Sequence, residues 1–187
     1  MLNQALLCFL IITTIACYKS EELTVLDISA VEVRSEGGLT YVDSQLYTGV
    51  LTGHTAEGVL ISKISYVKGK LDGEYETWHH SGQLKESRFF RNNKKTGEHR
   101  GYWSNGAASY HYAFNDGLYV DTLKEWYING QLYKLEYYQD GKQFGRQKAW
   151  KKDGELYLNY DVINGRKYGN TGIKHCKSLW NEVDSSF

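Results

Sequence analysis

A chain of 187 residues is long enough for one ordinary domain or one repeat array and too short for two large catalytic domains. Its 22 Lys and Arg residues balance its 22 Asp and Glu residues, so no cationic excess favours a nucleic acid as partner. A composition of 41% hydrophobic and 24% charged residues argues against wholesale disorder, and 16 Tyr and 19 Gly beside 0 Pro indicate many strands and tight turns.

The chain opens on a mainly apolar segment. Residues 1–16 carry no charged side chain, and the run from Ala5 to Ala16 is predominantly apolar. This run is too short to cross a bilayer as a helix of about 20 residues, and it matches the apolar region of a secretory signal. We therefore expect residues 1–16 to be a signal peptide. A short N-terminal anchor or a buried strand is the alternative interpretation.

Cys17 stands directly after this segment. The sequence Thr14-Ile15-Ala16-Cys17 resembles a bacterial lipobox, which implies that the Cys17 thiol is acylated, the leader is removed and the chain is held to a membrane. No Asp follows Cys17, which by the same resemblance implies the outer membrane, and residues 18–22 look like an acidic tag for export to the cell surface. We expect a cell-envelope lipoprotein with a lipidated tether and an N-terminal capping strand over residues 17–41.

One thiol is left for the mature chain. Of the 3 cysteines, Cys8 leaves with the leader and Cys17 is lipidated, so Cys176 stands alone. A metal or redox role for the pair His175-Cys176 is one interpretation, but two adjacent ligands do not complete a zinc site. We favour a buried, inert cysteine within a C-terminal cap.

A period of 24 residues governs the middle of the chain. The glycines that define it are Gly58, Gly82, Gly106, Gly130 and Gly154. Recurrence over so many consecutive steps identifies a repeat protein. We place five repeats over residues 42–161, followed by a partial repeat and a C-terminal cap over residues 162–187.

Three further columns keep the same step. Large aromatic residues recur at Trp78, Tyr102, Trp126 and Trp150, with His54 in the first position. Apolar residues recur at Val42, Tyr66, Phe90, Phe114, Tyr138 and Val162. A second column of glycines comprises Gly49, Gly73, Gly97, Gly145 and Gly169, and Asp121 interrupts it. Such columns predict side chains that meet their counterparts in neighbouring repeats.

Each repeat carries the signals of one β-hairpin. Asn-Gly and Asp-Gly pairs at the first set of glycines favour tight turns with positive φ, and Trp78 and Leu84 face each other across one such turn. A second loop, residues 68–73 in one repeat, carries the chain to the next hairpin. Because an isolated hairpin is only marginally stable, neighbouring hairpins must stack. The sequence therefore predicts an all-β fold of tandem 24-residue β-hairpin repeats, stacked into an elongated antiparallel sheet.

The repeat unit resembles a known family. From Tyr66 to Leu84 it follows the pattern Tyr-x-x-Gly-x-x-x-Gly-x-x-x-x-Trp-x-x-x-Gly-x-Leu, which is similar to the MORN-repeat variant, a bacterial group often labelled YwqK-type antitoxins. Related MORN repeats in eukaryotes are associated with membranes and with protein scaffolding, so the resemblance implies binding rather than chemistry. It also implies, as an alternative, an antitoxin or immunity role with a toxin as partner.

No set of residues indicates catalysis. His79-His80 has no histidine counterpart in the other repeats, so we interpret it as a solvated turn and predict no metal site. Glu74 and Glu76 share one face of a strand, as an acid/base pair requires, but a single-layer sheet offers no obvious cleft to shift their pKa values. We therefore expect no enzyme, no catalytic residue and no cofactor.

The expected function is that of a non-enzymatic envelope lipoprotein. Its repeat array is predicted to be a protein-interaction scaffold, with an unknown protein partner and a membrane anchor on Cys17. In the alternative glycan hypothesis, the column Trp78, Tyr102, Trp126 and Trp150 stacks against sugar rings of peptidoglycan or surface glycans. If these rings instead pack as a buried ladder that holds the sheet together, the glycan hypothesis loses its main support.

Overall fold

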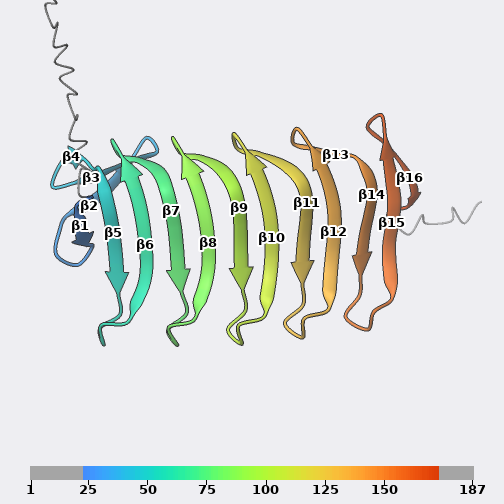
Figure 1. The fold of residues 1–187 in the computed structure, drawn as a ribbon, viewed down its shortest axis with the longest axis horizontal. Helices are drawn as coiled ribbons and strands as arrows, with labels where there is room; N and C mark the ends of the chain where they lie inside the picture. Colours follow the sequence, from blue (N-terminus) through green and yellow to red (C-terminus); the bar gives the residue numbers. More distant parts are fainter. Residues whose placement is uncertain (1–22, 173–187) are drawn as a thin grey trace, which may run out of the picture.

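The computed structural model describes residues 23–172, which form a long antiparallel sheet of consecutive hairpins (Figure 1). The main sheet is built from β1 (Val25–Asp27), β5 (Gly49–His54), β6 (Leu60–Val67), β7 (Lys70–Trp78), β8 (Leu84–Arg91), β9 (Lys94–Tyr102), β10 (Ala108–Asn115), β11 (Leu118–Trp126), β12 (Leu132–Gln139), β13 (Lys142–Gln143), β14 (Gly145–Trp150), β15 (Leu156–Ile163) and β16 (Arg166–Asn170). The predicted all-β fold of stacked hairpin repeats is confirmed. Among the described residues, no helix is long and apolar enough to cross a membrane.

One end of each hairpin carries the glycines of the 24-residue period. The turn glycines have φ between 81° and 91°, as the sequence predicts. At Gly82, the backbone N–H donates to the His79 carbonyl, and the His79 N–H donates to the Gln83 carbonyl, both at 2.8 Å. This is a type I turn closed by a glycine in the left-handed region. Trp78 pairs with Leu84 beside it, as expected.

The opposite end of each hairpin differs from the prediction. Residues 68–73 do not form a loop: the chain reverses within Lys68 and Gly69, at φ 48° and 76°, and β7 already begins at Lys70. Asp116 and Gly117 turn in the same way, at φ 48° and 86°. Two residues with positive φ match the right-handed twist of the strands that they join. The strands therefore form a continuous meander with tight turns at both ends.

The N-terminal end contains more structure than one capping strand. A second sheet of β2 (Val33–Glu36), β3 (Leu39–Val42) and β4 (Gln45–Leu46) lies beside β5, and β1 pairs in parallel with β5. Val42 lies in this second sheet, whereas the other described members of its apolar column lie in the main sheet. Val42, Tyr47 and Leu51 form a buried cluster against which Tyr66 packs. This cluster joins the second sheet to the first strands of the main sheet.

Several predictions fall on residues outside the described range. The signal peptide (residues 1–16), the lipidated Cys17 and the pair His175-Cys176 all lie outside residues 23–172. Of the expected C-terminal cap, the structure describes residues 162–172, which comprise the end of β15 and the edge strand β16.

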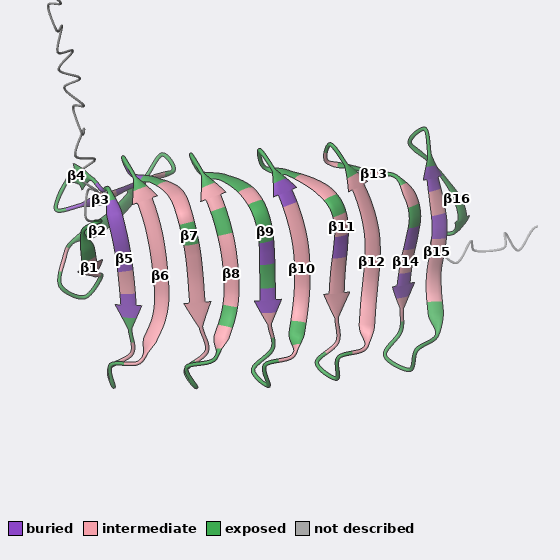
Figure 2. Cartoon of the chain, in the orientation of Figure 1, coloured by how far each residue is buried: buried purple, intermediate pink, exposed green. Residues whose placement is uncertain are grey.

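The apolar column packs as an aromatic row on one face of the sheet. Phe114 is 5% exposed, and its ring centroid lies 4.6 Å from that of His99 and 4.5 Å from that of Tyr119. Tyr119 in turn lies 5.1 Å from Tyr138. Opposite Phe114 across the strand pair stands Gly97, a member of the second glycine column. Within the strands of the main sheet most residues are only half-buried (Figure 2), so this row supplies much of the packing of a sheet that is largely one layer deep.

Asp121 has a positive φ at a position where the other members of the column are glycines. Its φ is 59°, and the glycines of the same column also have positive φ, for example 104° at Gly73 and 63° at Gly145. A side chain in this region meets steric resistance. We expect Asp121→Gly to raise the free energy of unfolding by about 0.5–1 kcal/mol in urea titrations. Asp116→Gly is the control, because Asp suits the first position of a two-residue turn, and equal changes in both variants would contradict this account.

His99 and Gln147 serve the same structural purpose two repeats apart. They are the largest side chains with almost no exposure, at 2% and 0%. His99 Nε2 donates to the Phe89 carbonyl at 2.8 Å, and Gln147 Nε2 donates to the Tyr137 carbonyl at 3.1 Å. Phe89 and Tyr137 are themselves counterparts, since both pairs of positions differ by two periods of 24. Glutamine can therefore replace histidine here without loss of the hydrogen bond.

Replacing His99 with glutamine would keep the buried hydrogen bond and remove the titratable imidazole. Burial lowers the pKa of His99, and the positive charges of Arg88 and Lys95 lower it further. The hydrogen bond to Phe89 acts in the opposite direction but does not outweigh them. The unfolded chain therefore binds the proton more readily, so stability is full above about pH 6.5 and falls as the pH drops through that value. We expect urea midpoints of His99→Gln to fall less between pH 7.5 and pH 5 than those of wild type. The exposed His80→Gln variant should follow wild type, and parallel profiles for all three chains would contradict the prediction.

Candidate binding groove

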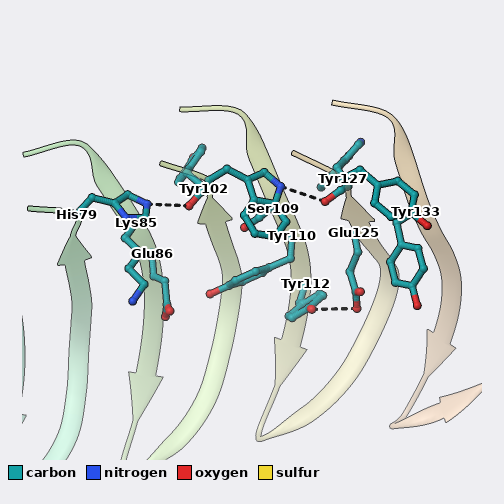
Figure 3. Close-up of a pocket in the computed structure, with 12 residues that line it drawn as sticks. His79, Lys85, Glu86, Tyr102, Ser109, Tyr110, Tyr112, Glu125, Tyr127 and Tyr133 are labelled. Carbon is teal, nitrogen blue, oxygen red and sulfur yellow. Dashed lines mark hydrogen bonds between the residues drawn. The ribbon is translucent and has the colours of Figure 1, made fainter. Parts of the chain in front are cut away.

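A groove with a volume of about 500 Å³ crosses three consecutive hairpins near their type I turns (Figure 3). We call it the aromatic groove. Its aromatic lining consists of Tyr102, Trp103, Tyr110, Tyr112, Trp126, Tyr127 and Tyr133. Its polar lining consists of His79, Lys85, Glu86, Ser109 and Glu125. These residues come from β8 to β12 and from the turns that follow β7, β9 and β11, so no single repeat forms the groove.

Hydrogen bonds between repeats hold the turn end of the groove. The side chain that follows each aromatic residue of the 24-residue column donates to the backbone carbonyl of the next aromatic residue in that column. His79 Nε2 donates to Tyr102 at 3.1 Å, and Trp103 Nε1 donates to Trp126 at 3.1 Å (Figure 3). One repeat further, the Tyr127 hydroxyl donates to a backbone carbonyl at 3.0 Å in the same way. His79 is therefore part of the groove wall, which differs from the solvated turn expected from the sequence, whereas His80 is exposed.

Gly101 has no side chain, which leaves space for the Tyr110 ring on the floor of the groove. Gly101 is buried beneath Tyr110, and a Cβ at this position would lie 2.1 Å from Cε1 of the Tyr110 ring. Tyr110 in turn stacks on Tyr112, with ring centroids 4.5 Å apart and an interplanar angle of 19°. The corresponding cross-strand pair in the last repeat is Ala149 and Leu158. Glycine at position 101 thus accompanies a ring at position 110.

Both carboxylates of the groove are paired with cations. Glu86 forms an ion pair with Arg88, whose Nε donates to the Tyr110 hydroxyl at 3.2 Å. Glu125 accepts hydrogen bonds from the Tyr112 hydroxyl at 3.1 Å and from Lys134 Nζ at 3.0 Å. Glu86 is therefore held by a neighbour on its own strand β8, and Glu125 by partners on the two adjacent strands, β10 and β12.

The hydroxyls of Tyr110 and Tyr112 stay protonated. Burial raises the pKa of Tyr110 and of Tyr112, and the negative charge of Glu125 raises that of Tyr112 further. Burial lowers the pKa of Lys134, but the hydrogen bond to Glu125 and the negative charge of Glu125 outweigh it. The pKa of the Lys134 ammonium group is therefore raised overall. At neutral pH the groove thus combines the neutral hydroxyls of Tyr110 and Tyr112 with two paired carboxylates, and the exposed Lys85 lies at its rim.

The predicted aromatic column is only partly contained in the groove. Tyr102 and Trp126 line it, whereas Trp78 and Trp150 are not among the lining residues. All four rings are half-buried, so they are neither a buried ladder nor a fully exposed row. The remaining rings of the groove belong to positions that sequence reasoning passed over. The concentration of Trp and Tyr between positions 102 and 133 was the signal that could have identified them.

Glu74 and Glu76 lie on β7 outside the groove lining. Lys63 Nζ lies 3.1 Å from Glu74 Oε2 and 3.8 Å from Glu76 Oε2, which accounts for both carboxylates as cross-strand ion pairs. Within residues 23–172, no group of three or more His, Cys, Asp or Glu residues could hold a metal ion.

Comparison with known proteins adds little. No protein family matches the chain, and no curated protein does. Among solved structures, the chain is similar to a crystal structure of the GtfA/B complex bound to UDP and GlcNAc, with a TM-score of 0.23 and 15% sequence identity. The match covers 67% of this chain and 23% of that chain, so it spans less than a quarter of that protein. At this TM-score the likeness carries no argument about fold or function.

Proposed function

We propose that the chain is a non-enzymatic binding module of the cell envelope, tethered through an acyl chain on Cys17, and that its repeat array is a scaffold with the aromatic groove as binding site. The observation that carries the proposal is the groove itself, since it is assembled from three successive repeats. Repeat arrays commonly bind partners on surfaces of this kind, which extend over several units. The resemblance to MORN repeats also implies binding.

The lining favours binding over catalysis. Aromatic side chains dominate it, and they supply contact area with little loss of conformational entropy. Glu86 and Glu125 already accept hydrogen bonds and ion pairs from residues of the chain, so neither stands free as an acid or base. The predicted antitoxin role rests on the resemblance alone.

Photo-crosslinking tests whether the groove is the binding site. A benzophenone amino acid in place of Trp103, which is 38% exposed, should form an adduct of higher mass in cells that produce the full chain. The control position is Phe144, which is 43% exposed and lies outside the groove lining. Because benzophenone reacts with C–H bonds of any class of molecule, the result does not presuppose the ligand. Adducts from position 144 alone, or from neither position, would contradict the proposal.

Metabolic labelling tests the tether. We expect radiolabelled palmitate to enter the wild-type chain, to be lost in Cys17→Ala, and to fractionate with membranes. An unlabelled wild-type chain in the soluble fraction would contradict the envelope location. It would also favour the alternative function, an antitoxin or immunity role.

A further inference from the structure

The rings of the aromatic groove offer flat apolar surface to a ligand. Trp103 is 38% exposed at the groove, and Tyr110 and Tyr112 form a stacked pair on its floor. Pyranose rings present one or both faces as patches of C–H bonds, which pack against aromatic faces. A volume of about 500 Å³ lies within the range of about 300–1,000 Å³ that is typical of small-molecule sites.

The charges of the groove favour a neutral ligand. Arg88 compensates Glu86 and Lys134 compensates Glu125, while the further cation of the lining, Lys85, is exposed at the rim and stays solvated. An anionic ligand would meet both carboxylates, and a cationic ligand would have to compete with Arg88 and Lys134 for them. A neutral ligand leaves both ion pairs intact and avoids the cost of burying an unpaired charge.

The polar groups of the groove distinguish between neutral ligands. Aromatic grooves also bind proline-rich peptides, which are neutral and extended. Proline has no N–H group, so such a peptide would bury the oxygens of Glu86 and Glu125 without offering donors to them. A sugar carries adjacent hydroxyls that donate to carboxylates and accept from groups such as the Lys85 ammonium at the rim. Hydroxyl donors therefore suit this lining better than a proline-rich backbone.

From these three observations we infer that the aromatic groove binds a neutral oligosaccharide. The inference rests on the proposed function, because it names the ligand of the same site. The rings stack on the sugar faces, and the paired carboxylates accept hydrogen bonds from the hydroxyls.

Calorimetric titration of the full chain tests this inference. The chain is kept in a detergent without a sugar headgroup, and the neutral probes are hexamers of β-1,4-linked glucose and of β-1,4-linked N-acetylglucosamine. A hexamer of galacturonic acid and a peptide of ten prolines are the competing probes. We expect one or both neutral hexamers to bind, and both competing probes to leave the heat signal unchanged.

Matched variants locate the binding. In Trp103→His, the imidazole can donate to the next repeat as His79 does, while most of the ring surface is lost. We expect about tenfold weaker binding in this variant, about threefold weaker binding in Lys85→Ala, and unchanged binding in Phe144→Leu. Thermal unfolding verifies that each variant is folded. Lys85 is exposed, so Lys85→Ala provides the comparison if Trp103→His does not fold.

Other outcomes would overturn the inference. Absence of binding by both neutral hexamers would do so, as would equal affinity in wild type and all three variants, or binding of the galacturonic acid hexamer alone. Binding of the proline peptide in place of the hexamers would also overturn it, while leaving the groove as the binding site. Failure of all probes together with absence of a crosslink from position 103 would overturn the proposed function as well.

Discussion

Phe114→Ala is expected to lower the free energy of unfolding by about 3–5 kcal/mol. Phe114 is 5% exposed and lies at the centre of the aromatic row, where its ring meets those of His99, Tyr112 and Tyr119. The Lys95 ammonium also lies 5.0 Å from the ring centroid. Removal of the ring leaves a cavity that a sheet of strands fixed by hydrogen bonds cannot close. Urea unfolding followed by circular dichroism measures the loss.

Phe89→Ala is the matched control for this prediction. Phe89 also lies in the main sheet, on β8, but its side chain is 40% exposed. Its truncation should therefore cost about 1 kcal/mol, well below the loss in Phe114→Ala, because a large part of its surface already meets water and no enclosed cavity is left. Similar losses in the two variants would show that the aromatic row is not the core of the array.

Gly101→Ala is expected to cost about 1–3 kcal/mol of stability, because the added methyl group collides with the Tyr110 ring at 2.1 Å. The ring can relieve the collision only by leaving its stack on Tyr112, which rearranges the floor of the groove. We therefore expect ligand binding to weaken together with stability. Urea unfolding and calorimetric titration of the same variant measure both effects.

A double-mutant cycle identifies the cause. In the last repeat, Ala149 and Leu158 form the cross-strand pair that Gly101 and Tyr110 form in the third. The double variant Gly101→Ala with Tyr110→Leu copies that pair, so it should be more stable than the sum of the two single changes predicts. Additive losses would contradict the steric explanation. Ligand binding should stay weak in the double variant, because it lacks the stacked ring.

The hairpins were predictable because their signals are local. Glycine in the type I turn adopts positive φ wherever the period places it, and in the second glycine column Asp121 keeps a positive φ without being glycine. The tight turn at Lys68 was missed, since lysine at φ 48° is a poor signal for a two-residue turn. Asp116-Gly117 offered the clearer signal for the same turn two repeats further along the chain.

The groove was not predictable in the same way, because it depends on how side chains from different repeats point. The register of β9 and β10 shifts between Ala108 and Tyr110, and the same shift recurs beside the type I turn of every hairpin in the main sheet. The backbone is therefore common to the repeats, and what differs is the side chains: Tyr110 and Tyr112 stand where the preceding repeat has Glu86 and Arg88. The predicted column of four aromatic residues therefore identifies two groove residues, Tyr102 and Trp126, and misses the rings that form the floor.

Fluorine NMR tests the central claim, that the aromatic groove is where a ligand binds. The full chain is labelled with 5-fluorotryptophan, each signal is assigned by a Trp→Phe substitution, and the hexamers of β-1,4-linked glucose and of β-1,4-linked N-acetylglucosamine are added in separate titrations. The account predicts shifts at Trp103 and Trp126, which line the groove, and unchanged signals at Trp78 and Trp150, which do not. Shifts confined to Trp78 and Trp150, or no shift at any tryptophan, would contradict it.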